Sequence, residues 1–327
     1  MYVLGVETSC DETSVSIVKD GKEILSNEIS SSLEFHKKYG GVIPEIASRK
    51  QLEMITSVAD IAVKDAKIEL KDIGLVSVTS GPGLLGSLLI GVSFAKAISL
   101  SLNIPILGVN HVYSHIYANF LNRQQIKFPF IGLVVSGGHT SLFLVKGFHN
   151  IEILGETSDD ACGEAFDKVA KILGMGYPGG PLIEKLAAGG DPKKIKFNCA
   201  NAKSALDFSF SGIKTAVLYY VKGRKIGLPE KRDICASFQE SVINSLVNKS
   251  FEACRLEKVN RLVVGGGVAI NNRLRQRFFD ASSRAGIKCY FPQKTLCMDN
   301  AAMVAGLGYR LFKEGFSSGL DLTAQLN

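Results

Sequence analysis

Two histidines at a spacing that suits metal binding are the first chemically informative residues of this sequence. His111 and His115 stand four positions apart, and the chain contains only five histidines. On a helix, side chains at positions i and i+4 share one face, so both imidazoles could bind one metal ion. Two histidines that simply line or cap a helix would have the same spacing. Spacing alone leaves both interpretations open.

The residue after the first histidine argues against a metallopeptidase. The HExxH motif of those enzymes places a glutamate there as general base, whereas this chain has Val112, which cannot accept a proton. A third metal ligand could come from Asp299, which stands at an expected helix start and could instead be the N-cap. Two histidines and one carboxylate would suit Fe(II) or Zn(II) and leave coordination positions open for a substrate oxygen.

The elements that position these residues follow a repeated pattern. Segments 2–18 and 130–145 both predict a strand, a small polar turn and a second strand, which together form a hairpin. Segments 75–83 and 261–267 both predict a strand that runs into a glycine-rich turn and then a helix. Two ordered pairs of matching units indicate a duplicated α/β lobe.

The glycine-rich turns suggest a nucleotide. Glycine lets the backbone approach a phosphate closely, although a single such turn is equally natural as a plain turn. Residues 81–86 have Walker A spacing, but Ser87 occupies the position of the phosphate-binding lysine. No complete GxGxxG fingerprint follows an expected strand either. The remaining architecture with paired phosphate hairpins is the actin and hexokinase type.

A chain of 327 residues is near the upper limit for a single core, so two lobes are expected. We predict a duplicated α/β fold of the actin and hexokinase type, with a nucleotide cleft between the lobes. The N-terminal lobe would span residues 1–125, with a C-terminal helix in 302–327 packing back on it. The C-terminal lobe would span residues 126–301.

Composition is that of an ordinary globular protein of the cytoplasm. The chain is 46% hydrophobic and 21% charged, and its net charge of +7 permits an anionic partner without requiring one. Its seven cysteines form an odd set without a CxxC pair, which fits reduced thiols. The longest apolar run, 84–102, contains Lys96 and several serines and predicts a buried helix rather than a membrane span. The N-terminus does not have the pattern of a secretion signal.

Six motifs spread over nearly the whole chain resemble those of the bacterial TsaD family. They are GVETSCDET at 5–13, YGGVIPEIASR at 39–49, GPGL at 81–84, NHVYSH at 110–115, SGGHT at 136–140 and FSGIKT at 210–215. The resemblance implies transfer of a threonylcarbamoyl group from L-threonylcarbamoyladenylate to N6 of adenosine 37, in tRNAs that read ANN codons, with release of AMP. Members were once labelled O-sialoglycoprotein endopeptidases because of the histidine pair.

The resemblance also implies the partners and the cofactor. The partners would be tRNA, the threonylcarbamoyl-AMP substrate, a TsaB-type paralogue and a TsaE-type ATPase. The cofactor would be one divalent metal per subunit, with Fe(II) expected and Zn(II) as the alternative. Basic clusters at 193–196, 222–225, 231–232 and 273–277 could line a tRNA path, or could be solvated surface.

Position by position, the resemblance assigns the metal ligands and the residues around the adenylate. The metal ligands would be His111, His115 and Asp299. The residues around the adenylate would be Val134, Val135, Ser136, Gly137, Gly138, His139, Asp167, Gly180, Glu184 and Asn272. Glu184 departs from the aspartate of many relatives, which keeps the carboxylate and lengthens the side chain by one methylene.

Three further residues are candidates for a catalytic role. Asp11 or Glu12 would assist proton movement, and Lys214 would stabilise adenylate charge; a solvated turn and a surface lysine are the alternative interpretations. Two other functions also remain: a related metal-dependent carbamoyltransferase, and a metalloendopeptidase that would need a base other than Val112.

Overall fold

The computed structural model describes residues 1–123, 125–199 and 204–326, and the chain forms two compact units. The first unit comprises Met1–Ile126 and Pro292–Asn327, and the second comprises Lys127–Phe291. The segment that returns to the first unit therefore begins at Pro292, earlier than the residue 302 expected from the sequence. Because of this earlier return, Asp299 belongs to the same unit as the histidine pair.

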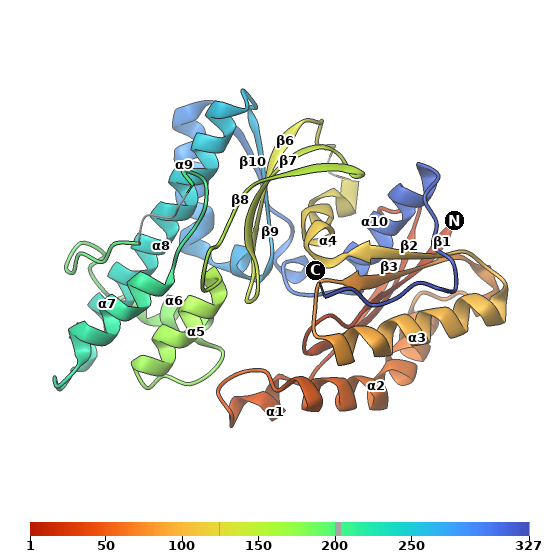
Figure 1. Ribbon diagram of the computed structural model, residues 1–327, viewed down its shortest axis with the longest axis horizontal. Helices are drawn as coiled ribbons and strands as arrows, with labels where there is room; N and C mark the ends of the chain where they lie inside the picture. Colours follow the sequence, from red (N-terminus) through yellow and green to blue (C-terminus); the bar gives the residue numbers. More distant parts are fainter. Residues whose placement is uncertain (124, 200–203, 327) are drawn as a thin grey trace. The chain divides into compact units, whose positions relative to one another are not determined.

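The first unit is built on a mixed five-stranded sheet with the order β3-β2-β1-β4-β5 (Figure 1). The strands are β1 (Tyr2–Glu7), β2 (Glu12–Lys19), β3 (Glu23–Ser31), β4 (Ile73–Gly81) and β5 (Ile106–Asn110). The first three strands form an antiparallel meander, and β4 and β5 are added parallel to β1. The carboxyl ends of β1, β4 and β5 consequently lie at one edge of the sheet, where Glu7, Gly81 and Asn110 end their strands.

Helices pack against both the meander and the parallel strands of this sheet. They are α1 (Leu33–Lys37), α2 (Pro44–Asp65), α3 (Leu85–Leu102), α4 (His111–Tyr117) and α10 (Ala301–Lys313), with short 3-10 turns η1 (Leu70–Asp72), η2 (Ala118–Arg123) and η4 (Lys294–Leu296). Helix α2 packs on β2 and β3 and beside α3, which packs on β4, while α10 packs on β1, β2 and β4. The core between them is aliphatic, with Val6, Ile17 and Val76 completely buried.

Helix α3 is the one helix of the described residues that is long and apolar enough to cross a membrane. It packs against β4 and α2 and buries one face, including Leu88 and Val92. Leu85, Leu89 and Leu100 on the same helix remain 46%, 48% and 67% exposed. The structure thus buries this helix less completely than the sequence predicts.

The second unit repeats the topology of the first. Its sheet has the order β10-β9-β6-β7-β8. The strands are β6 (Phe130–Val135), β7 (Thr140–Gly147), β8 (Asn150–Glu156), β9 (Arg261–Gly265) and β10 (Lys288–Tyr290). Again three strands form an antiparallel meander and two are added in parallel. The helical segments are α5 (Cys162–Ile172), α6 (Gly179–Ala187), α7 (Ser211–Val221), α8 (Leu228–Leu256), α9 (Asn272–Ala285) and the 3-10 turn η3 (Gly267–Ile270).

The two sheets correspond strand for strand, from β1 with β6 through β5 with β10. The predicted duplicated α/β fold is therefore confirmed. The duplication could be recognised in the sequence because each hairpin and each strand-to-helix turn has its own local signature.

Close packing of α10 on β1 generates a first prediction. A Cβ atom added at Gly5 would lie 2.2 Å from the carbonyl oxygen of Ala301 and 2.9 Å from the Cβ of Ala305. Gly5→Ala should therefore push α10 off the sheet and lower the free energy of unfolding by about 1–3 kcal/mol. Urea unfolding would measure the change. Gly41→Ala, where an added Cβ meets no atom within 4 Å, is the control and should unfold like the unmodified protein.

Candidate functional site

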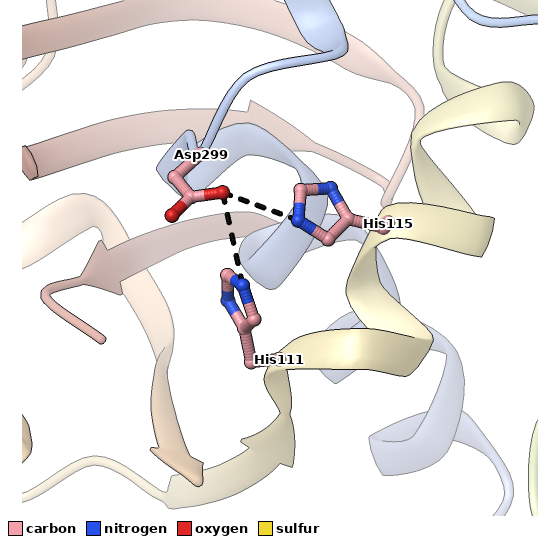
Figure 2. A group of neighbouring side chains, drawn as sticks. All are labelled: His111, His115 and Asp299. Atoms are coloured by element: carbon pink, nitrogen blue, oxygen red, sulfur yellow. Dashed lines mark ion pairs between the residues drawn. The ribbon is translucent and has the colours of Figure 1, made fainter. Parts of the chain in front are cut away.

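The histidine pair and Asp299 converge in the first unit (Figure 2). Asp299 Oδ1 lies 3.1 Å from His115 Nε2 and 3.7 Å from His111 Nε2. One possible ligand atom from each of the three side chains lies within 4.8 Å of the others. The two histidine side chains are 6% and 0% exposed, and the Asp299 side chain is 20% exposed. A set of two imidazoles and one carboxylate at these separations could hold a divalent metal.

Local structure explains why these three side chains face one another. Helix α4 begins at His111 because Asn110, at the end of β5, accepts a hydrogen bond from the Tyr113 N–H at 3.1 Å. The i and i+4 positions then place both imidazoles on one side of α4. Asp299 precedes α10, whose N-cap is Asn300, since its side chain accepts from the Met303 N–H. The N-cap role considered for Asp299 is therefore wrong, and its carboxylate is available to the histidines.

His115 supports the metal interpretation independently of spacing. Both of its ring nitrogens are buried, and neither has a hydrogen-bond partner among the described residues. Asp299 faces Nε2 at 3.1 Å without hydrogen-bond geometry. A buried polar group without a partner costs about 1–3 kcal/mol, which a metal bound to this nitrogen would offset. The residues present therefore fit a metal.

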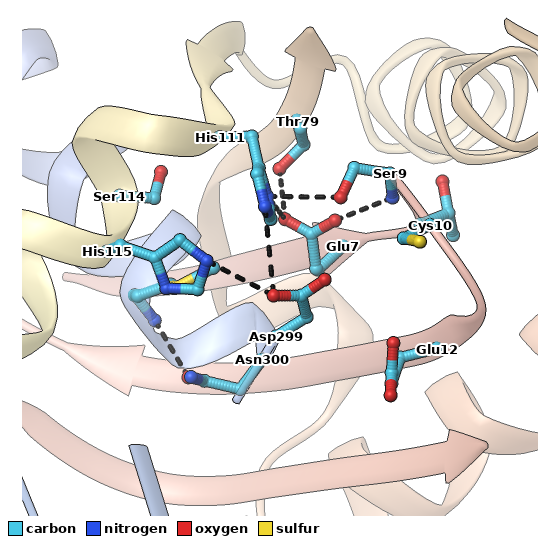
Figure 3. A network of polar contacts seen from close by, with 12 residues as sticks. Glu7, Ser9, Cys10, Glu12, Thr79, His111, Ser114, His115, Asp299 and Asn300 are labelled. Carbon is cyan, nitrogen blue, oxygen red and sulfur yellow. Dashed lines mark hydrogen bonds and ion pairs between the residues drawn. The ribbon is translucent and has the colours of Figure 1, made fainter. Parts of the chain in front are cut away.

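Glu7 completes the site and was not identified from the sequence. Its carboxylate accepts hydrogen bonds from the Ser9 N–H at 2.6 Å and the Thr79 hydroxyl at 2.6 Å, and it lies 3.1 Å from His111 Nδ1 (Figure 3). Ser9 Oγ also lies 3.0 Å from His111 Nδ1. A proton on Nδ1 that faces these oxygens leaves Nε2 of His111 directed at Asp299. A single carboxylate at the end of an otherwise apolar strand was the signal available in the sequence.

Burial and charge have opposite effects on the pKa values of Glu7 and His111. Burial disfavours the ionised forms of both groups, but their mutual attraction prevails. It holds the pKa of the Glu7 carboxyl below its ordinary value and, together with Asp299, raises the pKa of His111 to about 9. Glu7 is consequently ionised at neutral pH. It supplies a fixed negative charge behind His111.

Asp11 ends the turn between β1 and β2, and Glu12 is the first residue of β2, in the same unit as the metal triad. Figure 3 draws Glu12 and Cys10 beside the network around Asp299. Burial, and then the negative charges of Asp299 and Asp11, raise the pKa of Glu12 well above its ordinary value. A carboxyl group with a raised pKa is suited to proton transfer near neutral pH. Asp11 is buried rather than solvated, contrary to the alternative of a solvated turn.

In the second unit, six of the predicted adenylate residues lie at the end of β6 or in the turn that follows it, residues 134–139. Val134 and Val135 end β6, and the turn Ser136–His139 is closed by a hydrogen bond from the Ser136 N–H to the His139 carbonyl at 2.8 Å. Gly266, with a φ of +93°, follows β9 and approaches so closely that an added Cβ would lie 2.3 Å from the Val135 carbonyl oxygen. Only glycine fits this contact between the two turns.

The predicted adenylate residues on α5, α6 and α9 are linked by hydrogen bonds. Asp167 accepts a hydrogen bond from the Gly179 N–H at 2.7 Å, which fixes the start of α6 beside Gly180. Glu184 accepts from both the backbone N–H and the side-chain amide of Asn272, at 2.7 and 3.0 Å. The lengthened side chain of Glu184 therefore reaches the N-terminus of α9. Added Cβ atoms at Gly137, Gly138 and Gly180 would meet no atom within 4 Å, so these backbones face open space that a ligand could fill.

Lys214 is held in an ion-pair network rather than free on the surface. Its ammonium group lies 2.7 Å from Asp160, which also pairs with Lys168 at 2.6 Å. Lys168 pairs in turn with Glu164 at 2.8 Å. Asp159, the residue before Asp160, accepts hydrogen bonds from the Phe210 and Ser211 N–H groups and so holds the start of α7. Neither aspartate was identified from the sequence, because the contacts of Asp159 with Phe210 and of Asp160 with Lys214 join residues more than fifty positions apart.

The basic side chains of residues 273–277 make ion pairs and hydrogen bonds within the second unit. Arg273 and Arg277 both pair with Glu240. Arg275 donates to the Ala269 carbonyl at 2.7 Å, and its guanidinium lies 4.8 Å from the Phe291 ring centroid. These contacts hold α9 in place, and Glu240 neutralises part of the positive charge of the cluster.

Solved structures with the same two-unit fold cover nearly the whole chain. The chain is similar to the HypF of T. kodakarensis, with a TM-score of 0.67 and 15% identity over 96% of this chain and 48% of that one. It spans about half the length of that protein. It is also similar to component A of (R)-2-hydroxyglutaryl-CoA dehydratase from Acidaminococcus fermentans, with a TM-score of 0.54 and 17% identity over 95% and 98% of the two chains. At these identities the likeness concerns the fold alone.

Sequence comparison shows the family. The family model of tRNA N6-adenosine threonylcarbamoyltransferase, TsaD, matches residues 23–306. A protein of that name from Thermosipho africanus is 52% identical over 100% of this chain and 99% of its own length. Another from Clostridium kluyveri is 48% identical over 99% and 96%. The chain has the two-unit fold and the His-His-Asp group of a candidate metal-dependent transferase. It belongs to the TsaD family, which confirms the resemblance seen in its motifs.

The support that Glu7 gives to His111 yields a second prediction. Glu7→Gln preserves the shape of the side chain but removes the charge that faces His111 Nδ1, so affinity for a divalent metal should fall about 10- to 100-fold. Calorimetric titration with Zn(II) would measure it. Thr79→Val removes only one of the hydrogen bonds to Glu7 and should have a smaller effect. Unchanged metal affinity in Glu7→Gln would contradict this role.

Two adjacent glycines yield a third prediction. Gly180→Ala adds a methyl group in open space on α6, so it should leave folding unchanged or stabilise it by up to about 1 kcal/mol, yet weaken AMP binding. Gly179→Ala is the matched comparison. Its Cβ would lie 2.6 Å from the Cβ of Ala170 and 2.7 Å from the Phe166 carbonyl, so it should destabilise the second unit. Thermal unfolding and AMP titration would separate the two effects.

Proposed function

We propose that this chain transfers the threonylcarbamoyl group from L-threonylcarbamoyladenylate to N6 of adenosine 37 in tRNAs that read ANN codons. The observation that carries the proposal is the convergence of His111, His115 and Asp299 in a chain of the TsaD family. The enzyme would be an acyltransferase that modifies tRNA in the cytoplasm. In the reaction, a bond forms between N6 and the carbamoyl carbon, the bond from that carbon to the phosphate oxygen breaks, and AMP leaves.

An exocyclic amino group of adenine is a weak nucleophile, so the enzyme must orient the reactants and stabilise negative charge on the carbonyl oxygen. His111, His115 and Asp299 would hold the divalent metal, Fe(II) in our proposal with Zn(II) as the alternative, whose Lewis acidity polarises that carbonyl. Glu7 would keep His111 oriented. Asp299 would contribute a negative charge that balances part of the charge of the ion.

Residues of the second unit would bind the adenylate. The open space beside Gly137, Gly138 and Gly180 supports this assignment, because a phosphate can approach a glycine backbone closely where no side chain or neighbouring atom fills the space. The remaining residues proposed to surround the adenylate are Val134, Val135, Ser136, His139, Asp167, Glu184 and Asn272. Asp167 and Glu184 already hold the starts of α6 and α9, which supports a positioning role for both carboxylates.

Proton movement needs an acceptor for the proton that N6 loses. We assign it to Glu12 or Asp11, the first residue of β2 and the turn residue before it. The raised pKa of Glu12 supports this role, because a carboxylate with such a pKa is a stronger base than an ordinary one. Lys214 would stabilise the negative charge of the adenylate. Because Lys214 also pairs with Asp160, this stabilisation would be weaker than that from an unpaired lysine.

The proposed partners are tRNA, a TsaB-type paralogue and a TsaE-type ATPase. The net charge of +7 suits an RNA partner. An apolar face on α3 suits a protein partner, since Leu85, Leu89 and Leu100 lie on one side of that helix and are exposed.

A fourth prediction tests the function directly. Incubation of the protein with its proposed partners, tRNA and adenylate labelled in the threonyl group should place label on adenosine 37. His115→Ala and Asp299→Asn should each lower the rate at least about 100-fold, and a chelator should abolish labelling until metal is restored. A tRNA with guanosine at position 37 is the control.

Label on another nucleotide, or transfer unaffected by both substitutions, would contradict the proposal. Chelator-sensitive cleavage of a glycoprotein would instead favour a metalloendopeptidase. Carbamoylation of a substrate in the absence of tRNA would favour a related carbamoyltransferase.

A further inference from the structure

Two aromatic rings stand exposed on a short segment of the first unit that none of the roles above explains. The segment comprises α1 and the turn that follows it, residues 33–43, at the start of α2 (Figure 1). We call it the aromatic segment. Phe35 is 47% exposed and Tyr39 is 51% exposed, although large aromatic side chains are usually buried where the fold permits it.

A lysine accompanies each ring. The ammonium nitrogen of Lys50, on α2, lies 4.8 Å from the centroid of the Phe35 ring, and that of Lys38 lies 4.9 Å from the centroid of the Tyr39 ring. The surface therefore presents an exposed π system and a positive charge together at two places. Aromatic rings combined with cations suit an unpaired nucleotide, whose base stacks on the ring while its phosphate meets the ammonium group.

The aromatic segment is tied to Asp11, at the end of the turn that leads into β2. His36 is completely buried and accepts a hydrogen bond from the Ile43 N–H through Nδ1, at 3.2 Å. Its other ring nitrogen therefore bears the proton and donates to Ser32 Oγ at 2.9 Å. Ser32 in turn donates to the Asp11 carbonyl through both its hydroxyl and its backbone N–H, at 2.8 and 3.1 Å.

This chain of hydrogen bonds has a consequence for the rings. His36 lies between Phe35 and Tyr39 in the sequence and anchors the segment at its centre, so the exposed rings are held on a fixed support. That support is continuous with the turn that ends at Asp11, just before Glu12 begins β2, in the unit that holds the metal triad. Beyond Tyr39, the backbone at Gly41 faces open space, which leaves room for a bound group.

We propose that the aromatic segment binds the single-stranded part of the substrate RNA, by stacking Phe35 and Tyr39 on bases of the anticodon loop and pairing Lys38 with its phosphates. The inference rests on the proposed function and extends it to the contact with RNA. Loop bases can be unstacked from one another and stacked on aromatic side chains, which is how single-stranded RNA is commonly bound. Both charge and ring chemistry favour RNA over an apolar protein surface here.

The test measures RNA affinity with the full-length protein. Binding of a fluorescent anticodon stem-loop RNA that contains adenosine 37 would be followed by anisotropy at constant salt. Phe35→Ala and Tyr39→Ala should each raise Kd about 5- to 20-fold. Phe35→Tyr and Tyr39→Phe retain the rings and should bind like the unmodified protein. Tyr219→Ala, which removes an exposed aromatic ring on α7 of the second unit, is the matched control and should leave Kd unchanged.

Other measurements on the same variants keep the outcomes distinct. Metal and AMP affinities and the unfolding temperature should stay unchanged, which separates loss of an RNA contact from loss of folding. If the double variant Phe35→Ala/Tyr39→Ala binds RNA as tightly as the unmodified protein, the inference is overturned. The same conclusion follows if it loses only its association with the TsaB-type protein. Absence of transfer by the unmodified protein, with RNA affinity still dependent on the rings, would overturn the proposed function and leave the RNA contact standing.

Discussion

The packing of α10 on the first sheet is the constraint on which the candidate metal site depends. Two glycines allow the close approach: an added Cβ at Gly5 of β1 would lie 2.2 Å from the Ala301 carbonyl oxygen of α10, and one at Gly308 of α10 would lie 2.0 Å from Ser77 Oγ of β4. Ser77 in turn donates to the Val304 carbonyl at 2.8 Å. Hydrogen bonds from the first N–H groups of α10 to Ser14 and Asn27 hold its N-terminus against β2 and β3. This arrangement positions Asp299 opposite α4.

Charge balance is the second feature of this site. Glu7, Glu12 and Asp299 place three carboxyl groups in a partly buried region, and burying like charges together is unfavourable unless a cation or a proton compensates. His111 compensates Glu7, as its raised pKa indicates. The charge of Glu12 is reduced instead by a proton, because burial and the neighbouring carboxylates raise its pKa. A divalent cation held by His111, His115 and Asp299 would take the place of the proton on His111 and favour ionised Glu12, which agrees with the buried His115 Nε2, a nitrogen without a hydrogen-bond partner among the described residues.

The duplicated fold uses one topology for two kinds of chemistry. In the first unit, the turn between β1 and β2 carries Asp11 at its end and is held by the buried Gln51, which donates to the carbonyls of Cys10 and Glu12 at 2.9 Å. In the second unit, the equivalent turn between β6 and β7 carries Gly137 and Gly138, with open space beside them. Acidic side chains suit cations and protons, whereas exposed backbone N–H groups suit phosphate. The two units therefore share a strand order and differ in the residues of this turn.

The sequence by itself determined the features that depend on near neighbours. The i and i+4 spacing predicted that His111 and His115 would share a helix face, and the alternation of apolar residues predicted both hairpins, because side-chain direction follows from the local period of each element. The motifs determined the family. Only the tertiary structure decided which distant residues meet. It placed Asp299 opposite residues nearly two hundred positions earlier, made Asn300 the N-cap, joined Glu7 to His111 and paired Lys214 with Asp160. These contacts depend on how whole elements pack, and no local period of the chain encodes that packing.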